Sequence, residues 1–254
     1  MKLAVLTLVY NEEEFIKACV KNWEGKVDKH LILISTMPWS GVPFESDESV
    51  QIAKRLNVET ILGAWKSEGE QRNWGLARLY DYDYVIIVDP DEFYTKESQD
   101  KILDRLNDPY DYVNMVMEKI PVFKIEKMIT YWKTTDFILN PPDLHLPCIA
   151  LDPKQAVFHS MRNPQLADRV RTFAEYQPII GGTVCHHLSW VKSDKKIEEK
   201  IVSYSHSNVI PSDWFENVWS KWEEGSDMIV RPYGAERGKA IKSPAPDEIK
   251  QLFF

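Results

Sequence analysis

Two aspartates follow an unbroken apolar run in the sequence YVIIVDPDEFYT, residues 84 to 95. Asp89 and Asp91 lie two positions apart. Alternate residues of an extended segment point the same way, so both carboxylates can reach one point. Pro90 stiffens the turn between them. Two hard oxygen ligands that converge beyond a buried strand suit Mg²⁺ or Mn²⁺, and the pair therefore predicts a divalent metal site.

Two familiar kinds of acidic or nucleotide site do not fit this segment. An EF-hand loop that began at Asp89 would need glycine at its sixth position, where Tyr94 stands. A dinucleotide site would need a glycine-rich first loop, and LVYNEE at residues 8 to 13 contains no glycine. An acidic turn that merely caps the next helix remains an alternative. Against it, a buried strand that leads into two converging acids is costly without a cation.

The loop after the first apolar run, YNEEE at residues 10 to 14, carries three glutamates. Rossmann proteins hold a pyrophosphate on the backbone N–H groups of a helix start, and glutamates at that position would repel it. A metal held by Asp91 could bridge the two phosphates instead. The sequence therefore predicts that any pyrophosphate ligand binds through a metal.

The elements that must position these acids alternate along the first half of the chain. Continuous apolar runs predict strands at residues 3–9, 30–34, 58–62 and 84–88, and helical spacing predicts helices at 15–23, 50–56 and 70–79. Asn11 and Glu14 have the spacing of a capping box at the first helix. Apolar strands that alternate with helices predict an α/β fold, with a mostly parallel sheet covered by helices on both faces.

Beyond Asp91 the pattern changes. Helical or extended spacing predicts a helix at 98–106, an extended segment at 112–117, a strand at 184–190 and a helix at 194–205. The proline-punctuated stretch between Pro121 and Pro178 predicts loops and short antiparallel strands, and the tail from Arg231 is expected to be irregular. The stripe of Trp214, Trp219 and Trp222 has helical spacing and predicts core packing.

Composition limits the function classes. The chain has 254 residues and a formal net charge of -8, which argues against nucleic acid as a partner. Its three cysteines are far apart and lack CxxC spacing, as expected for a reducing compartment. The N-terminal apolar run ends at Tyr10 without a cleavage site, and no apolar stretch approaches the about 18 residues needed to cross a bilayer. We therefore expect a cytoplasmic protein without a transmembrane segment.

Three segments together resemble the family 2 glycosyltransferases of the GT-A fold. They are YNEE after the first strand, EQRNWG at residues 70 to 75, and VDPDEF at 88 to 93, whose Asp89-Pro90-Asp91 matches the DxD motif. The later segment CHHLSWVKSDKKIEEKIVSYSH, residues 185 to 206, is similar to the closing segment of bisecting-type N-acetylglucosaminyltransferases and lipopolysaccharide-core glycosyltransferases.

The resemblance covers about residues 1–95 and 180–207. It implies a GT-A domain at 1–207, with a nucleotide-binding half at 1–95 and an acceptor half at 96–207. A C-terminal helical or irregular extension is expected at 208–254.

The resemblance also implies roles toward the nucleotide sugar. Tyr10 and Asn11 lie where the family's first loop contacts the base. Ser35 takes the place often held by an aspartate that contacts uracil. Arg72 matches an arginine that faces the diphosphate, with Gln71 beside it.

The metal ligands implied by the same resemblance come from two distant segments. Asp91 is expected on the ion, and Asp89 near the ribose, a metal-bound water or the ion itself. His187 matches a histidine that supplies a further ligand in some relatives. Only one of His186 and His187 can face the site, because neighbours in a strand point to opposite faces.

The implied reaction is metal-dependent transfer of a hexosyl or N-acetylhexosaminyl group, with inversion, from a nucleotide sugar to a glycan or other hydroxyl acceptor. A UDP-sugar is the expected donor. Such a reaction needs a carboxylate general base, for which Glu175 and Asp136 rank ahead of Asp168. Two alternatives stay open: a sugar-phosphate nucleotidyltransferase, which usually has a glycine-rich basic first loop, and a non-catalytic sugar-nucleotide-binding module.

Overall fold

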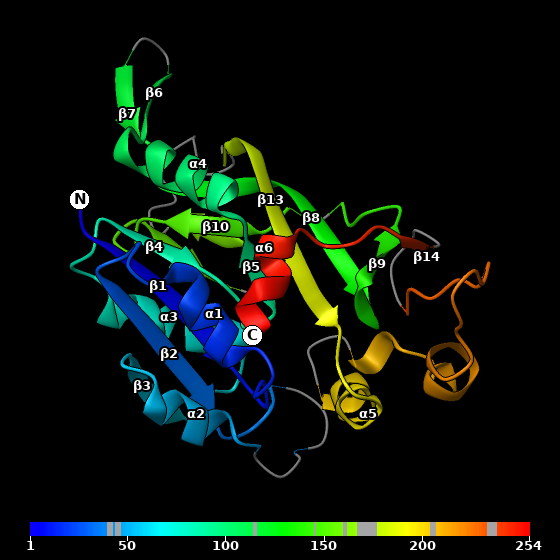
Figure 1. Cartoon of the computed structure of the whole chain (residues 1–254). Coiled ribbons are helices and arrows are strands. Elements are labelled where there is room, and N and C mark those ends of the chain that lie inside the picture. Colours follow the sequence, from blue (N-terminus) through cyan, green and yellow to red (C-terminus); the bar gives the residue numbers. More distant parts are fainter. Residues whose placement is uncertain are drawn as a thin grey trace.

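The computed structural model describes most of the chain, as residues 1–39, 43, 47–113, 116–144, 146–159, 162–166, 177–203, 207–232 and 238–254. Two candidate general bases, Asp168 and Glu175, lie outside these residues. Ten of the described strands form one large mixed sheet with helices packed against it, and the remaining four form two separate two-stranded sheets (Figure 1).

The first part of the sheet is parallel, in the order β3-β2-β1-β4. Its strands are β1 (Leu3–Val9), β2 (Lys29–Ser35), β3 (Glu59–Gly63) and β4 (Tyr84–Ile87). The helices between them are α1 (Ile16–Trp23), α2 (Ser49–Arg55) and α3 (Glu68–Arg78). The predicted alternation is confirmed, and β1 has the predicted bounds.

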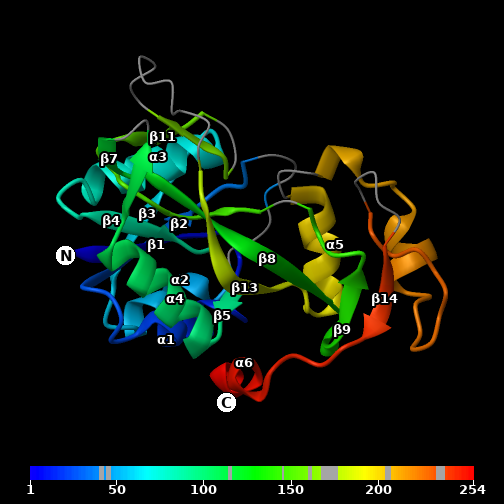
Figure 2. The same ribbon diagram turned by 90° about the horizontal axis from the view of Figure 1, so that it is seen from above.

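Alternate residues of β1 face two separate cores, because a strand points successive side chains to opposite faces. Leu3 and Val5 belong to the core with α1 and α4 (Lys96–Asn107), whereas Leu6 packs with α3 in the other. Gly75 lets α3 approach the sheet closely, since a Cβ there would lie 2.6 Å from a Leu6 methyl. Figure 2 shows α1 and α4 on one side of the sheet and α3 on the other, as predicted.

The sheet continues beyond β4 with antiparallel strands, in the order β4-β10-β8-β9-β14. These are β10 (Cys148–Leu151), β8 (Val122–Trp132), β9 (Thr134–Asn140) and β14 (Lys239–Lys242). The long strand β13 (Ile179–Trp190) runs parallel to β8 and also pairs, antiparallel, with β5 (Glu92–Tyr94). Through that second pairing β13 reaches the acidic segment that follows β4.

The remaining described elements are short or peripheral. They are β6 (Tyr110–Val113), β7 (Val116–Lys119), β11 (Ala156–Phe158), β12 (Pro164–Leu166), α5 (Asp194–Ser203), η1 (Ser207–Val209), the π-helix η2 (Phe215–Trp219), α6 (Asp247–Lys250) and η3 (Gln251–Phe253). No helix within the described ranges has both the length and the apolar character needed to span a bilayer.

Several local predictions were wrong. The proline-punctuated stretch contains the predicted short antiparallel strands but also the long strand β8, and the supposedly irregular tail contributes β14 and α6. The segment predicted to be extended at 112–117 does lie in strands where it is described, in β6 and β7. The first helix begins only at Ile16, without a side-chain cap, so the predicted capping box does not form. Asn11 has a left-handed backbone (φ 52°), and its side chain accepts instead from the Asp47 N–H at 3.4 Å.

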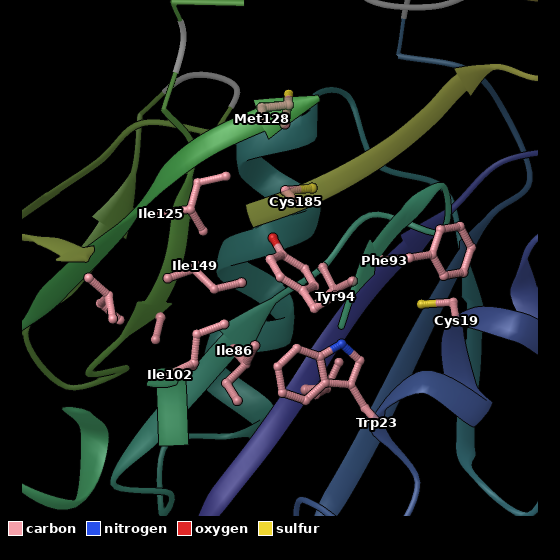
Figure 3. Packing of buried hydrophobic residues seen from close by; sticks show 14 of the residues in the cluster. Cys19, Trp23, Ile86, Phe93, Tyr94, Ile102, Ile125, Met128, Ile149 and Cys185 are labelled. Carbon is pink, nitrogen blue, oxygen red and sulfur yellow. The ribbon is translucent and has the colours of Figure 1, made fainter. Parts of the chain in front are cut away.

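Aliphatic side chains fill the core on the α1 side of the sheet together with the aromatic rings of Trp23, Phe93 and Tyr94 (Figure 3). Trp23 and Tyr94 pack with ring centroids 5.7 Å apart. Phe253, next to the C-terminus, contacts Phe15 and Phe93, so the end of the chain packs against α1 and β5. A second aromatic cluster confirms the core packing predicted for Trp214, Trp219 and Trp222, which pack together with Trp132 and Trp190.

Candidate functional site

Backbone pairing brings Asp91 and His187 together. His187 on β13 stands opposite Glu92 on β5, and the Leu188 N–H donates to the Asp91 carbonyl at 2.7 Å. As a result, Nε2 of His187 lies 3.6 Å from Oδ2 of Asp91. Of the two adjacent histidines, His187 therefore faces the acidic turn. His186 points away and bonds the Tyr131 hydroxyl at 2.8 Å.

Hydrogen bonds on the far side of the His187 ring fix where its proton lies. The Thr130 hydroxyl donates to Oδ2 of Asp143 at 2.8 Å, and it lies 3.3 Å from Nδ1 of His187. A hydroxyl has one proton to donate, so toward His187 the Thr130 oxygen accepts. The proton of a neutral ring is then on Nδ1, and the lone pair of Nε2 faces the carboxylate of Asp91.

The two groups that face each other are both electron-pair donors. Burial lowers the pKa of His187, although Asp91 raises it, which favours a neutral ring at neutral pH. Burial opposes the ionisation of Asp91, but the ammonium groups of Lys200 and Lys192 lower its pKa, so the carboxylate is charged. A neutral imidazole lone pair and a carboxylate separated by 3.6 Å create a favourable position for a cation.

These donors fit a Mg²⁺ or Mn²⁺ ion only as part of its ligand shell. No group of three His, Cys, Asp or Glu side chains suited to a metal occurs among the described residues. Mg²⁺ commonly binds through one or two protein carboxylates and completes its shell with phosphate oxygens and water. A carboxylate with an imidazole suits Mn²⁺ in the same way. Asp91 and His187 therefore fit an ion that binds together with a phosphorylated ligand.

Asp89 has different neighbours from Asp91. The Nη2 atom of Arg72 lies 2.9 Å and 3.3 Å from its two oxygens, and Nη1 of Arg162 lies 3.3 Å from Oδ2. Burial would raise the pKa of Asp89, but the two guanidinium groups, Arg72 before Arg162, hold it below its usual value. A metal-binding role for Asp89 stays a prediction. Its observed partners are arginines.

Arg162 carries no sequence signal of its importance, yet it holds the acidic turn together. It also pairs with the Glu92 carboxylate, and its Nη2 donates to the Ile87 carbonyl at 2.6 Å. Burial raises the pKa of Glu92 to about 7 even though Arg162 lowers it. Because Arg162 lies in the part of the chain that matches no motif, no local signal could have identified it.

Arg72 is fully buried between two acids. Beside Asp89 it pairs with Glu68, one turn earlier on α3, at 2.7 Å. Its contact with a diphosphate stays a prediction, because the contacts observed are to Glu68 and Asp89. Gln71 is also fully buried; its amide donates to the Leu33 carbonyl at 2.9 Å and accepts from the Trp39 indole at 2.8 Å.

The residues predicted to contact the base lie at the carboxyl ends of neighbouring parallel strands. Tyr10 and Asn11 follow β1, and Ser35 ends β2, where its hydroxyl donates to the Met37 carbonyl at 2.5 Å. In open α/β sheets this edge is where ligands bind. The structure thus places them on the same edge as the acidic turn, and their contacts with a base stay predictions.

Lysines that precede or belong to α5 neutralise the first loop. Lys192, 2% exposed, pairs with Glu12 at 2.5 Å, and Lys196 pairs with Glu13 at 3.3 Å and Asp47 at 2.6 Å. The expectation that the loop's glutamates would simply repel a pyrophosphate therefore needs correction, because all three have lysine partners, Glu14 through Lys192 at 3.8 Å. The repulsion was predicted from neighbours in sequence, whereas the lysines arrive from a distant segment.

A third lysine on this segment lies beside Asp91. The Nζ atom of Lys200 is 3.6 Å from Oδ2 of Asp91 and bonds both the hydroxyl of Ser189 at 2.6 Å and its carbonyl at 3.1 Å. Its side chain is 14% exposed. The sequence alone predicted no role for Lys200.

The candidate general bases are not joined to this site by the described contacts. Asp136 on β9 pairs with Lys250 of α6 at 2.9 Å, which directs its carboxylate to the C-terminal helix. Glu175 and Asp168 fall outside the described ranges. All three assignments stay predictions.

Comparison with known proteins adds little. No family model and no curated protein matches the chain. A crystal structure of S. aureus TarS 1-349 is similar with a TM-score of 0.37 and 20% identity, over 51% of this chain and 36% of that one. A second crystal structure of S. aureus TarS has the same TM-score, identity and coverage of this chain, and the match covers 22% of that second chain. The chain therefore spans about a third or less of these structures, and a TM-score of 0.37 carries no argument about fold or activity.

Proposed function

We propose that this protein is a metal-dependent glycosyltransferase that uses a nucleotide sugar, with a UDP-sugar as the expected donor. The observation that carries the proposal is the pair of Asp91 and His187 at the ligand-binding edge of an α/β sheet. The Oδ2 atom of Asp91 and the Nε2 atom of His187 face each other at 3.6 Å. The resemblance of the DxD and closing segments to family 2 glycosyltransferases supports the same conclusion.

Some residues of the chain would hold the ion, and others would orient the acidic turn and the nucleotide base. Asp91 and His187 would hold the ion, which when bound supplies Lewis-acid stabilisation of the leaving phosphate. Arg72 and Arg162 hold Asp89 and Glu92, and so keep the turn that carries Asp91 in place. Tyr10, Asn11 and Ser35 would orient the base at the neighbouring strand ends.

In the reaction, the acceptor oxygen bonds to the anomeric carbon while the bond from that carbon to the phosphate oxygen breaks. The electron pair of the broken bond goes to the phosphate, and the acceptor proton goes to a carboxylate base. Glu175 and Asp136 remain the proposed bases, and inversion of configuration is part of the proposal. The acceptor is a glycan or another hydroxyl compound.

The alternatives are less well supported. A nucleotidyltransferase would be expected to have a glycine-rich, basic first loop, whereas this loop offers acids paired with Lys192 and Lys196. A binding module without activity would not need two donors that converge on one cation position. Each alternative nevertheless has a distinct outcome in one experiment.

The experiment is incubation with Mn²⁺ and a panel of UDP-, GDP- and dTDP-sugars without acceptor. We expect slow hydrolysis of one donor, abolished by EDTA and reduced about 100-fold or more in Asp91→Asn, because loss of a ligand removes several kcal/mol of metal catalysis. Asp100→Asn, on the exposed surface of α4, is the matched control.

Hydrolysis that persists undiminished in Asp91→Asn and in EDTA would show that the site is wrong. Release of pyrophosphate from a nucleoside triphosphate would indicate a nucleotidyltransferase. Nucleotide binding without turnover, also with glycan acceptors added, would indicate a binding module.

A further inference from the structure

Lys200 is a largely buried ammonium group, with its side chain 14% exposed, at the candidate metal position. It extends from α5 to within 3.6 Å of the Asp91 carboxylate. Lysine side chains are rarely buried unless their charge is matched. Here the charge is placed beside the carboxylate proposed to hold a divalent ion.

The position of this ammonium is determined by its surroundings. Ser189 on β13 binds it through both the hydroxyl and the carbonyl, and the Trp190 ring lies 5.6 Å away. The helix itself is anchored to the edge of the parallel sheet, because Lys196 near its start pairs with Asp47 at 2.6 Å. Lys200 is therefore held at the site and differs from a mobile surface lysine.

Lysines already lie beside the acids around the candidate metal position before any ligand arrives. Lys192 pairs with Glu12 and lies 3.8 Å from Glu14, and Lys200 lies beside Asp91. A divalent ion at Asp91 would add two positive charges, and the diphosphate of a nucleotide sugar carries two negative ones. Before the sugar departs, the ion and the donor diphosphate therefore add no net charge to the site.

Transfer of the sugar changes this balance. The bond from the anomeric carbon to the terminal phosphate breaks, and its electron pair stays on the phosphate, which becomes a monoester. At neutral pH that group carries close to two negative charges, because its second pKa is about 6. An ion bound to Asp91 would neutralise that carboxylate. The ammonium of Lys200, 3.6 Å from Asp91, would then pair with the additional negative charge on the phosphate.

We propose that Lys200 binds the terminal phosphate of the leaving nucleoside diphosphate and stabilises the charge that develops there as the sugar is transferred. This inference rests on the proposed function and adds a named residue for the diphosphate. A cation placed where charge develops stabilises the transition state and products more than the intact donor.

The test is calorimetric binding of UDP, UMP and uridine in Mn²⁺, repeated with the guanosine series if uridine compounds do not bind. Lys200→Met removes the charge at nearly constant length, and Lys200→Arg keeps it. Lys195→Met, on the exposed side of the same helix, is the control. We expect Lys200→Met to weaken UDP about 10- to 100-fold, the range for a hydrogen bond between charged groups, with UMP changed less than about twofold.

Three results separate the possible failures. If the wild-type protein binds none of the diphosphates, the proposed function is wrong. If it binds UDP and Lys200→Met binds equally well, or loses UDP and UMP alike, Lys200 does not contact the terminal phosphate. Should Lys200→Met not fold, Lys200→Gln, which can still bond Ser189, carries the same expectations.

Discussion

Thr130→Val tests the hydrogen-bond chain that orients His187. Thr130 is 2% exposed, and valine has nearly the same shape, so the substitution removes a hydroxyl without leaving a cavity. Two bonds disappear: the one to Nδ1 of His187 at 3.3 Å and the one to Asp143 at 2.8 Å. The Nδ1–H group of His187, whose side chain is 22% exposed, then loses its protein acceptor, and the preference for that tautomer disappears.

The consequence for metal binding follows from the other ring nitrogen. A ring that moves its proton to Nε2 presents N–H, and no longer a lone pair, to Asp91. Loss of such an outer partner of a metal-binding histidine typically weakens metal affinity by about 10- to 100-fold. Stability should fall by only about 1–3 kcal/mol, the usual effect of lost buried hydrogen bonds.

The assay is Mn²⁺ titration in the presence of saturating UDP, followed by electron paramagnetic resonance of the free ion. Thr130→Ser restores the hydroxyl and should bind Mn²⁺ within about threefold of wild type, a small fraction of the expected loss. Urea unfolding measures the accompanying change in stability. Wild-type Mn²⁺ affinity in a folded Thr130→Val protein would refute the orientation argument, as would a Thr130→Ser protein as weak as the valine variant.

Two further predictions concern stability. Burial lowers the pKa of His30 to about 4 in the folded protein. On acidification the His30 side chain of the unfolded chain is therefore protonated first, near pH 6.5. The unfolding free energy should fall as the pH drops from 6.5 to 4, by at most about 3 kcal/mol from this residue. Urea unfolding of His30→Gln should show a shallower loss over that range, and an unchanged slope would contradict the assignment. Arg162→Met leaves Glu92 without its buried cation and leaves Asp89 with Arg72 alone, and should lower the unfolding free energy by about 3–5 kcal/mol. A loss below about 1 kcal/mol would mean that the pairs contribute little.

Local pattern was enough to identify the parallel half of the sheet. Continuous apolar runs and helical spacing depend on neighbours within a few residues, and they predicted β1 through β4 with the helices between them. The same local information placed Asp91 at the end of β4, because a carboxylate that directly follows a buried strand must lie at the sheet edge. The motif match also pointed to His187, which lies next to Asp91.

Local sequence pattern did not predict the strands that pair with segments distant in the chain. The β8 strand has an irregular pattern of buried and exposed residues, since it pairs with β9, β10 and β13 along different parts of its length. The short edge strand β14 is stabilised by its ladder with β9, almost 100 residues earlier in the chain. Proline content correctly indicated turns and short antiparallel strands, but not the long strand β8.

The sequence by itself determined that a cluster of acids would end the fourth strand of an α/β sheet, because both facts follow from residues close together in the chain. Only the tertiary structure decided which positive groups meet these acids. Arg162 reaches Glu92 across 70 residues, and Lys200 reaches Asp91 from the helix that follows β13 in the chain. Ion pairs have no periodicity along a chain, so their partners are settled when packing brings distant segments together and removes water from between them.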